Sequence, residues 1–114
     1  MDKEKLKQFR EEMSRLAEIA HKREGEKELN KLLENFNEWK SGTLDYNELA
    51  AIINETHHII NRNIWKAHDF DDEFIVIRAI YKKIISIEEM SEELYGYLKE
   101  KIERLRSVLG GQDE

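Results

Sequence analysis

The residues in this chain best suited to proton transfer or metal binding near neutral pH are its histidines. Three of the four lie within residues 57–68. His57 and His68 are eleven positions apart, which puts them on one face of a continuous helix but about 16 Å apart along its axis. One metal ion cannot bind both across that distance. We therefore expect neither a zinc nor a di-iron site, and no cofactor.

Residues 62–68, with the sequence Arg-Asn-Ile-Trp-Lys-Ala-His, resemble the Arg-polar-x4-His signature of HEPN domains. HEPN domains are small, all-helical and usually dimeric, and many are metal-independent ribonucleases or toxins. The resemblance implies that His68 is a general acid or base and that Arg62 stabilises developing phosphate charge. It also implies that Asn63 orients the site. The enzyme reading is the alternative to a function in protein–protein interaction.

The same region also fits a solvent-exposed helix end without chemistry. Arg15 and His21 have the same spacing as Arg62 and His68, within an ordinary amphipathic segment. The acidic run at residues 69–73 is an unusual neighbour for an RNA-binding cleft. On this interpretation His68 is favourable because it lies near the negative pole of a helix. We favour the solvent-exposed helix end over the ribonuclease site, and we therefore expect that the protein is not an enzyme.

Residues 37–48 resemble a degenerate EF-hand calcium loop, with Gly42 at its turn position. Asp45 and Glu48 would be its metal ligands, but two carboxylates are few for calcium. The alternative is a boundary between two helices. Gly42 would then close one helix, and Asp45 would cap the next with Glu48 as its capping-box partner. We favour the boundary, because Ser86 and Glu89 repeat the capping pattern where no calcium loop can be drawn.

The composition and the apolar spacing predict the elements that position these residues. The chain has 114 residues, 39% of them charged, with no proline and five glycines, which is typical of an all-α protein. We expect a compact bundle of four to five helices. One apolar stripe runs through residues 6–20 and another through residues 29–39, and their phase slips near Gly25. Either one long helix changes partners there or the helix ends, and we favour a kink or a short break.

Three further helices follow from capping and periodicity. The third spans residues 45–66. The fourth begins at Asp71 or Asp72 and continues through the apolar residues 74–85 as a central helix buried on most sides. The last begins with the capping box at Ser86 and ends at Gly110 and Gly111.

We interpret residues 1–114 as a single helical domain. Residues 1–25 form an N-terminal helix that packs on the bundle or protrudes from it, residues 26–109 form the core, and residues 110–114 form a tail.

Residues 36–90 resemble small uncharacterised bacterial proteins in the pattern Trp39, Gly42, Leu44, Glu48, Leu49, Ile52, His57, Arg62, Trp65, Ala79, Ile80, Ile84, Glu88 and Glu89. That resemblance implies a compact helical fold and no known activity.

The charge and the absence of certain segments exclude several classes of function. A net charge of −6 argues against binding to nucleic acid backbones. The lack of cysteine excludes disulfides and thiolate metal sites. No apolar stretch is long enough for a membrane span, and the charged N-terminus lacks the apolar core of a secretory signal. We therefore expect a cytoplasmic protein without a membrane partner.

The predicted function is that of a helical protein–protein interaction or assembly module, expected to be a homodimer. Its partner would be a second copy or another protein, since contiguous exposed apolar surface usually marks an interface. The predicted interface residues are Phe74, Ile77, Tyr81, Leu6, Phe9 and Met13. A monomer in which residues 74–85 form a central helix is the alternative.

Overall fold

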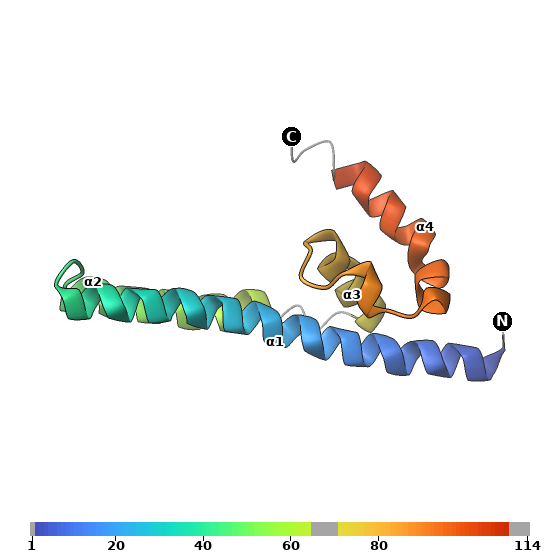
Figure 1. Cartoon of the computed structure of the whole chain (residues 1–114), viewed down its shortest axis with the longest axis horizontal. Coiled ribbons are helices and arrows are strands. Elements are labelled where there is room, and N and C mark those ends of the chain that lie inside the picture. The colour runs from blue at the N-terminus through green and yellow to red at the C-terminus, as the bar shows by residue number, and fades with distance from the viewer. Residues whose placement is uncertain (1, 65–70, 110–114) are drawn as a thin grey trace. The chain divides into compact units, whose positions relative to one another are not determined.

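The computed structural model describes residues 2–64 and 71–109 (Figure 1). The described residues form four α-helices and no strand: α1 (Lys3–Ser41), α2 (Tyr46–Ile59), α3 (Asp72–Tyr81) and α4 (Glu92–Leu109). A short π-helix, Ile60–Ile64, follows α2, and a 3₁₀ turn, Ile87–Glu89, precedes α4. The predicted all-α fold is confirmed, with four helices. None of the described helices is both long and apolar enough to cross a membrane.

The contacts within the described chain divide it into two compact units. We call residues 2–20 and 71–109 the core unit, and residues 21–64 the hairpin unit. Helix α1 belongs to both, because its first residues pack with α3 and α4 and the rest belongs with α2. The contacts thus group residues 2–20 with the C-terminal helices, whereas the sequence suggested an N-terminal helix of residues 1–25 beside a core of residues 26–109.

The predicted break near Gly25 is wrong, because α1 is a single helix of 39 residues. A kink within that helix stays a prediction. One glycine costs a helix only about 1 kcal/mol relative to alanine. The ion pair between Lys22 and Glu26, 3.8 Å apart and four positions apart in sequence, supports the helix across that point. The phase slip instead marks the division between the units, which corresponds to the other interpretation: one helix that changes partners.

The hydrophobic core lies in the core unit. It consists of Phe9, Met13, Leu16, Ala20, Val76, Ala79, Ile80, Ile85, Met90, Leu94, Leu98 and Ile102. The ring of Phe9 stacks on that of Tyr97 with centroids 5.0 Å apart. The first apolar stripe of the sequence is therefore the buried face of α1 in this unit.

Helix α3 begins at the predicted cap and ends earlier than predicted. The Asp71 carboxylate accepts a hydrogen bond from the Phe74 backbone N–H at 2.8 Å. The predicted helix through Ile85 stops at Tyr81, because Lys83 takes a left-handed conformation with φ of 62°. The Lys83 and Ile84 backbone N–H groups then donate to the carbonyls of Ile80 and Ala79, at 3.1 and 2.8 Å. This turn usually has glycine where Lys83 stands, so the sequence does not announce it.

Helix α4 begins later than its predicted start at Ser86. The Glu89 carboxylate does accept from the Ser86 backbone N–H at 2.8 Å, but this pair closes only the 3₁₀ turn. The helix starts at Glu92, and the Ser91 hydroxyl accepts from the Leu94 backbone N–H at 3.1 Å. Two capping serines lie five positions apart, and the second one starts the helix. The predicted stop at residues 110 and 111 lies outside the described residues.

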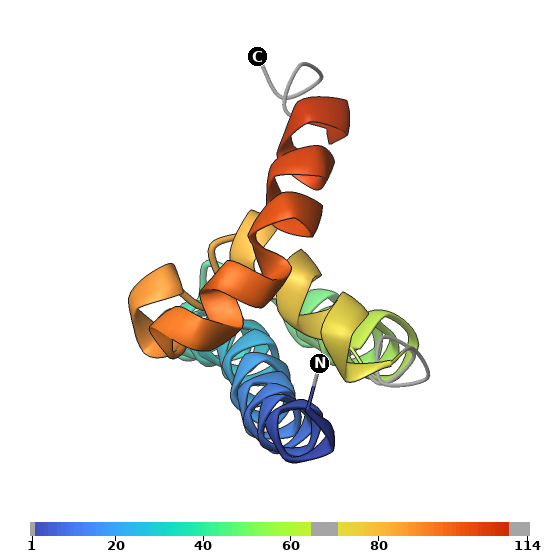
Figure 2. The ribbon, with the colours of Figure 1, turned by 90° about the vertical axis from the view of Figure 1, so that its right-hand side faces the viewer.

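The hairpin unit consists of the rest of α1, α2 and the π-helix, and α2 runs back beside α1 (Figures 1 and 2). Gly42, with φ of +89°, closes α1, and the Thr43 backbone N–H donates to the Glu38 carbonyl at 3.0 Å. The predicted capping box then starts α2. The Glu48 backbone N–H donates to Asp45 Oδ1 at 2.7 Å, and the Asp45 N–H donates to Glu48 Oε1 at 3.3 Å. The expected helix through residue 66 gives way to the π-helix at Ile60.

Candidate protein interface

The predicted catalytic residues lie at the end of the hairpin unit. Arg62 is exposed and lies in the π-helix. Asn63 belongs to the same π-helix by its backbone. His68 and the side chain of Asn63 lie outside the described residues, so the ribonuclease reading stays a prediction.

The predicted calcium ligands Asp45 and Glu48 are engaged with each other's backbone in the capping box. Pairs of Glu and His three positions apart occur at Glu18 and His21 and at Glu55 and His58. Within residues 2–64 and 71–109, however, no three acidic or histidine side chains gather closely enough to hold a metal ion. His57 Nε2 lies 2.9 Å from Asn61 Nδ2, one turn further along the chain. The Asp45–Glu48 segment, for its part, forms the N-terminal cap of α2.

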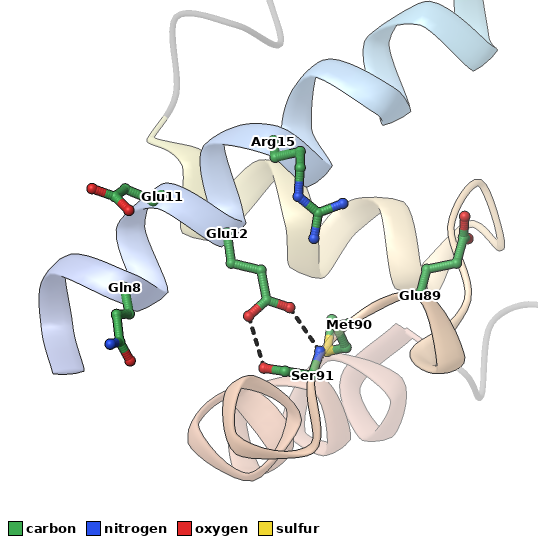
Figure 3. A pocket seen from close by; sticks show the side chains of 7 residues that line it. All are labelled: Gln8, Glu11, Glu12, Arg15, Glu89, Met90 and Ser91. Carbon is green, nitrogen blue, oxygen red and sulfur yellow. Dashed lines mark hydrogen bonds between the residues drawn. The ribbon is translucent and has the colours of Figure 1, made fainter.

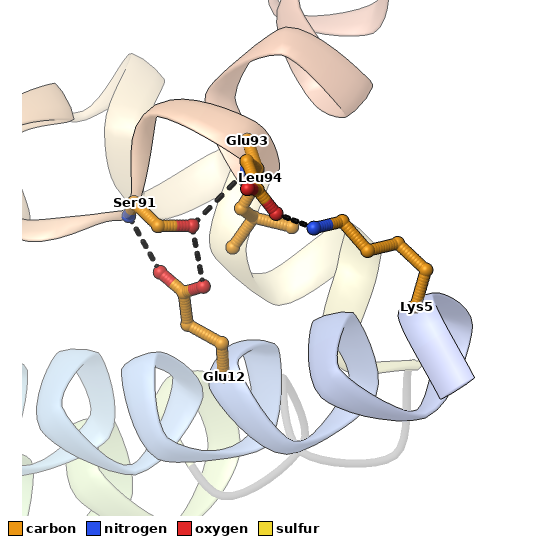
Figure 4. A network of polar contacts seen from close by, with 5 residues as sticks. All are labelled: Lys5, Glu12, Ser91, Glu93 and Leu94. Carbon is orange, nitrogen blue, oxygen red and sulfur yellow. Dashed lines mark hydrogen bonds and ion pairs between the residues drawn. The ribbon is translucent and has the colours of Figure 1, made fainter. Parts of the chain in front are cut away.

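A surface hollow of about 680 Å³ in the core unit carries a polar contact that the sequence did not suggest (Figure 3). Its lining residues are Gln8, Glu11, Glu12, Arg15, Glu89, Met90 and Ser91. Both Glu12 carboxylate oxygens accept hydrogen bonds from Ser91, one from the backbone N–H and one from the hydroxyl, each at 2.7 Å (Figure 4). A carboxylate is favourable at the positive N-terminal end of α4. Glu12 thus fastens α1 to the start of α4, and this contact is structural.

Two further ion pairs join the helices of the core unit. Lys5 pairs with Glu93 next to the Glu12–Ser91 contact (Figure 4). Lys101 Nζ donates to a Glu73 carboxylate oxygen at 2.8 Å. This hydrogen bond raises the pKa of Lys101 above its usual 10.5, and the charge of Glu73 adds to the shift, although partial desolvation opposes it.

A second hollow of the core unit, of about 400 Å³, is lined by Leu6, Phe9, Arg10, Met13, Asp71, Asp72, Glu73 and Tyr97. Its carboxylates include Asp71, which caps α3, and Glu73, which pairs with Lys101. These two carboxylates thus have structural contacts with α3 and α4.

The predicted interface residues differ in how far they reach the surface. Phe9 and Met13 fill the core and are only 5% and 7% exposed, so they offer little surface for a partner. Leu6, Ile77 and Tyr81 are half-buried, and Phe74 is 46% exposed. Phe74 is therefore the member of this set with substantial apolar surface.

The hairpin unit exposes much more apolar surface than this. We define the hairpin face as Leu29, Leu33, Phe36, Trp39, Tyr46 and Ile53, whose exposed fractions run from 38% at Phe36 to 73% at Tyr46. Leu29, Leu33 and Phe36 follow one another at spacings of four and three, so they form one stripe on α1. Among the side chains described in residues 21–62, only Leu49 and Thr56 are buried.

The second apolar stripe of the sequence therefore lies largely in solvent, although its spacing is as regular as that of the first. The signal that could have revealed this is the number of helices that follow α1 in this unit. Besides α1, the described residues of the hairpin unit form one α-helix, the 14-residue α2, which supplies one layer of packing. Sequence reasoning placed the interface in residues 74–85 instead, because those residues are apolar nearly all round.

Comparison with protein families, curated proteins and solved structures finds no match to this chain.

Proposed function

We propose that this protein is an assembly module that forms a homodimer through the hairpin face. The observation that carries the proposal is the contrast within the hairpin unit between its many exposed large apolar side chains and its two buried ones, Leu49 and Thr56. Contiguous exposed apolar surface usually marks a protein–protein contact, and Leu29, Leu33 and Phe36 form one such stripe on α1.

The area of the face suits a specific interface. Six side chains of this size, each about half exposed, present on the order of 600 Å² in each copy. A standard protein–protein interface buries roughly 800 Å² per partner. Backbone and polar atoms around the face can supply the remainder.

The shape of the hairpin unit favours a second copy as the partner. Stable domains have at least two packed layers of secondary structure, and two antiparallel helices form only one. A second hairpin laid on the first completes a four-helix bundle with the apolar side chains inside. Such an interface is isologous, because both copies contribute the same residues.

The oligomeric state tests the proposal. Light scattering at tens of micromolar should give twice the chain mass of 13.7 kDa. Leu33→Glu and Phe36→Glu each place a charge in the hairpin face, which is buried only in the dimer. Each should therefore raise the dimer Kd by about tenfold or more. Circular dichroism at the same concentration reports whether the helices persist in each variant.

Phe74→Glu is the matched control, because Phe74 is similarly exposed but belongs to the core unit. It should leave the mass unchanged. A monomer mass for the wild-type protein would overturn the proposal. A dimer disrupted by Phe74→Glu and not by Phe36→Glu would also overturn it, and would move the interface to residues 74–85.

A separate experiment tests the ribonuclease alternative. An assembly module should keep its dimer when His68 is replaced by alanine, and overexpression of the wild-type protein should leave cellular RNA intact. Cleavage of RNA by the purified protein, lost in both His68→Ala and Arg62→Ala, would establish the enzyme.

A further inference from the structure

We infer that the two hairpins pair antiparallel, with the symmetry axis at Leu33 and with Glu26 of each copy opposite Lys40 of the partner subunit. This inference rests on the proposed homodimer and adds its orientation. It follows from the placement of charges along α1 around the hairpin face.

Leu33 is the centre of a symmetric arrangement on α1. Glu26 lies seven positions before it and Lys40 seven positions after it, and seven residues are two helical turns. All three side chains therefore lie on the same side of α1, about 10 Å apart in succession. Glu26 and Lys40 are both exposed, and the 3.8 Å ion pair of Glu26 with Lys22 leaves 56% of the Glu26 side chain exposed. Each end of the apolar stripe therefore carries a charge within reach of a partner.

The two possible orientations of a dimer give opposite electrostatic results. When the helices run antiparallel about Leu33, the position seven residues before it faces the position seven residues after it. Glu26 then meets Lys40 of the partner subunit, and this attraction occurs twice. When the helices run parallel, Glu26 faces Glu26 of the partner subunit, and Lys40 faces Lys40 of the partner subunit. Like charges across an interface are unfavourable, so the charges select the antiparallel form.

The charges of residues 21–48, counted together, have the same polarity. In residues 21–31 the charged residues are Lys22, Arg23, Lys27 and Lys31 with Glu24, Glu26 and Glu28, a net charge of +1. In residues 32–48 they are Lys40 with Glu34, Glu38, Asp45 and Glu48, a net charge of −3. Antiparallel pairing brings the basic end of one hairpin against the acidic end of the other, whereas parallel pairing brings the two acidic ends together. Both the local pair and the wider charge distribution point to the same orientation.

Cross-linking measures the orientation directly, because the chain contains no cysteine. Single cysteines are placed at positions 26, 33 and 40 and treated with a short bis-maleimide. In the antiparallel dimer, Leu33→Cys links to itself. Glu26→Cys and Lys40→Cys each give little product alone but link when the two variants are mixed and allowed to exchange subunits. Self-linking of Lys40→Cys without linking in the mixture would overturn the antiparallel arrangement.

Charge exchange provides an independent measurement. Glu26→Lys should raise the dimer Kd by about threefold to tenfold at low salt, since it turns two attractions into repulsions. Adding Lys40→Glu in the same chain should restore the wild-type Kd. Glu103→Lys makes the same change in net charge at an exposed position of α4 and should have no effect. A Kd that does not respond to Glu26→Lys, or that the second substitution fails to restore, would contradict the inference.

The failure of this inference is distinguishable from failure of the proposed function. If the protein is a monomer by light scattering, the homodimer itself is wrong. If it is a dimer that Phe36→Glu disrupts but cross-linking follows the parallel pattern, the proposed interface stands and its orientation is wrong.

Discussion

The core unit and the hairpin unit use the same apolar spacing on α1 with opposite results. In the core unit, Phe9, Met13 and Leu16 are buried, and Leu16 has no exposed surface. In the hairpin unit, Leu29 and Leu33 are more than half exposed. The difference arises from the number of elements on each stripe, because α3 and α4 share a core with the first, whereas α2 alone belongs with the second. An apolar stripe shows which face a helix must bury, and it does not show what buries that face.

The polar contacts of the two units differ in how far apart their partners lie in the sequence. In the core unit, Glu12 bonds Ser91 across 79 positions of sequence and Lys101 bonds Glu73 across 28. In the hairpin unit, the contacts of Asp45 with Glu48 and of His57 with Asn61 join neighbours on the same turn. These contacts of the core unit thus join different helices, whereas these contacts of the hairpin unit join residues close together in the sequence.

The largest expected effect comes from removing a core side chain. Leu98 has no exposed surface, so Leu98→Ala should destabilise the core unit by about 3 kcal/mol. Leu33→Ala, the matched leucine of the hairpin face, should cost less than about 0.5 kcal/mol at concentrations where the protein is monomeric. Urea unfolding followed by circular dichroism measures both. Equal losses in the two variants would remove the contrast between the units.

Helix caps should have intermediate effects. Asp45→Ala removes the carboxylate that caps α2 and should destabilise that helix by about 1 kcal/mol. Asp71→Ala should cost α3 a similar amount. Amide hydrogen exchange, read separately for the two helices, localises each loss. The contrast is sharpened if the Asp45 variant also weakens the dimer and the Asp71 variant does not.

Gly25→Ala should stabilise α1 at the division between the two units. Apart from its chain neighbours and the backbone of its own helix, a methyl group added at Gly25 would have no heavy atom within 4 Å, so the substitution introduces no clash. It should add about 0.5–1 kcal/mol through the higher helix propensity of alanine. Slower amide exchange around residue 25 is the expected measurement. A loss of stability would show that the glycine is needed for bending at that point.

The smallest effect concerns the Lys101–Glu73 pair at alkaline pH. Because the folded-state pKa of Lys101 is raised, its contribution to stability is present below the ordinary pKa of 10.5 and is lost as the pH rises through the folded-state pKa. The contribution is small because Lys101 is half exposed. In urea midpoints measured from about pH 9 to about pH 12, the wild type should therefore lose its advantage over Lys101→Met. An advantage that persisted at the highest pH would mean that the pair contributes through packing.

The local structure can be predicted from neighbouring residue types. The all-α fold, the helix stop at Gly42, the capping box of Asp45 and Glu48 and the cap at Asp71 all follow from hydrogen bonds within five residues of the chain. Such bonds depend on neighbouring residue types, so spacing and composition reveal them.

The folded structure determines how these helices and caps are used. It carried α1 through Gly25, ended α3 at a left-handed Lys83 and started α4 at Ser91 beside Glu12. It also buried the stripe of residues 9–20 and left that of residues 29–39 exposed. These outcomes depend on contacts between segments far apart in the sequence. Several apolar stripes can be buried by the same helix, and they compete for it. Periodicity within one helix holds no information about that competition, so the candidate interface became visible only from the exposed surface of the folded chain.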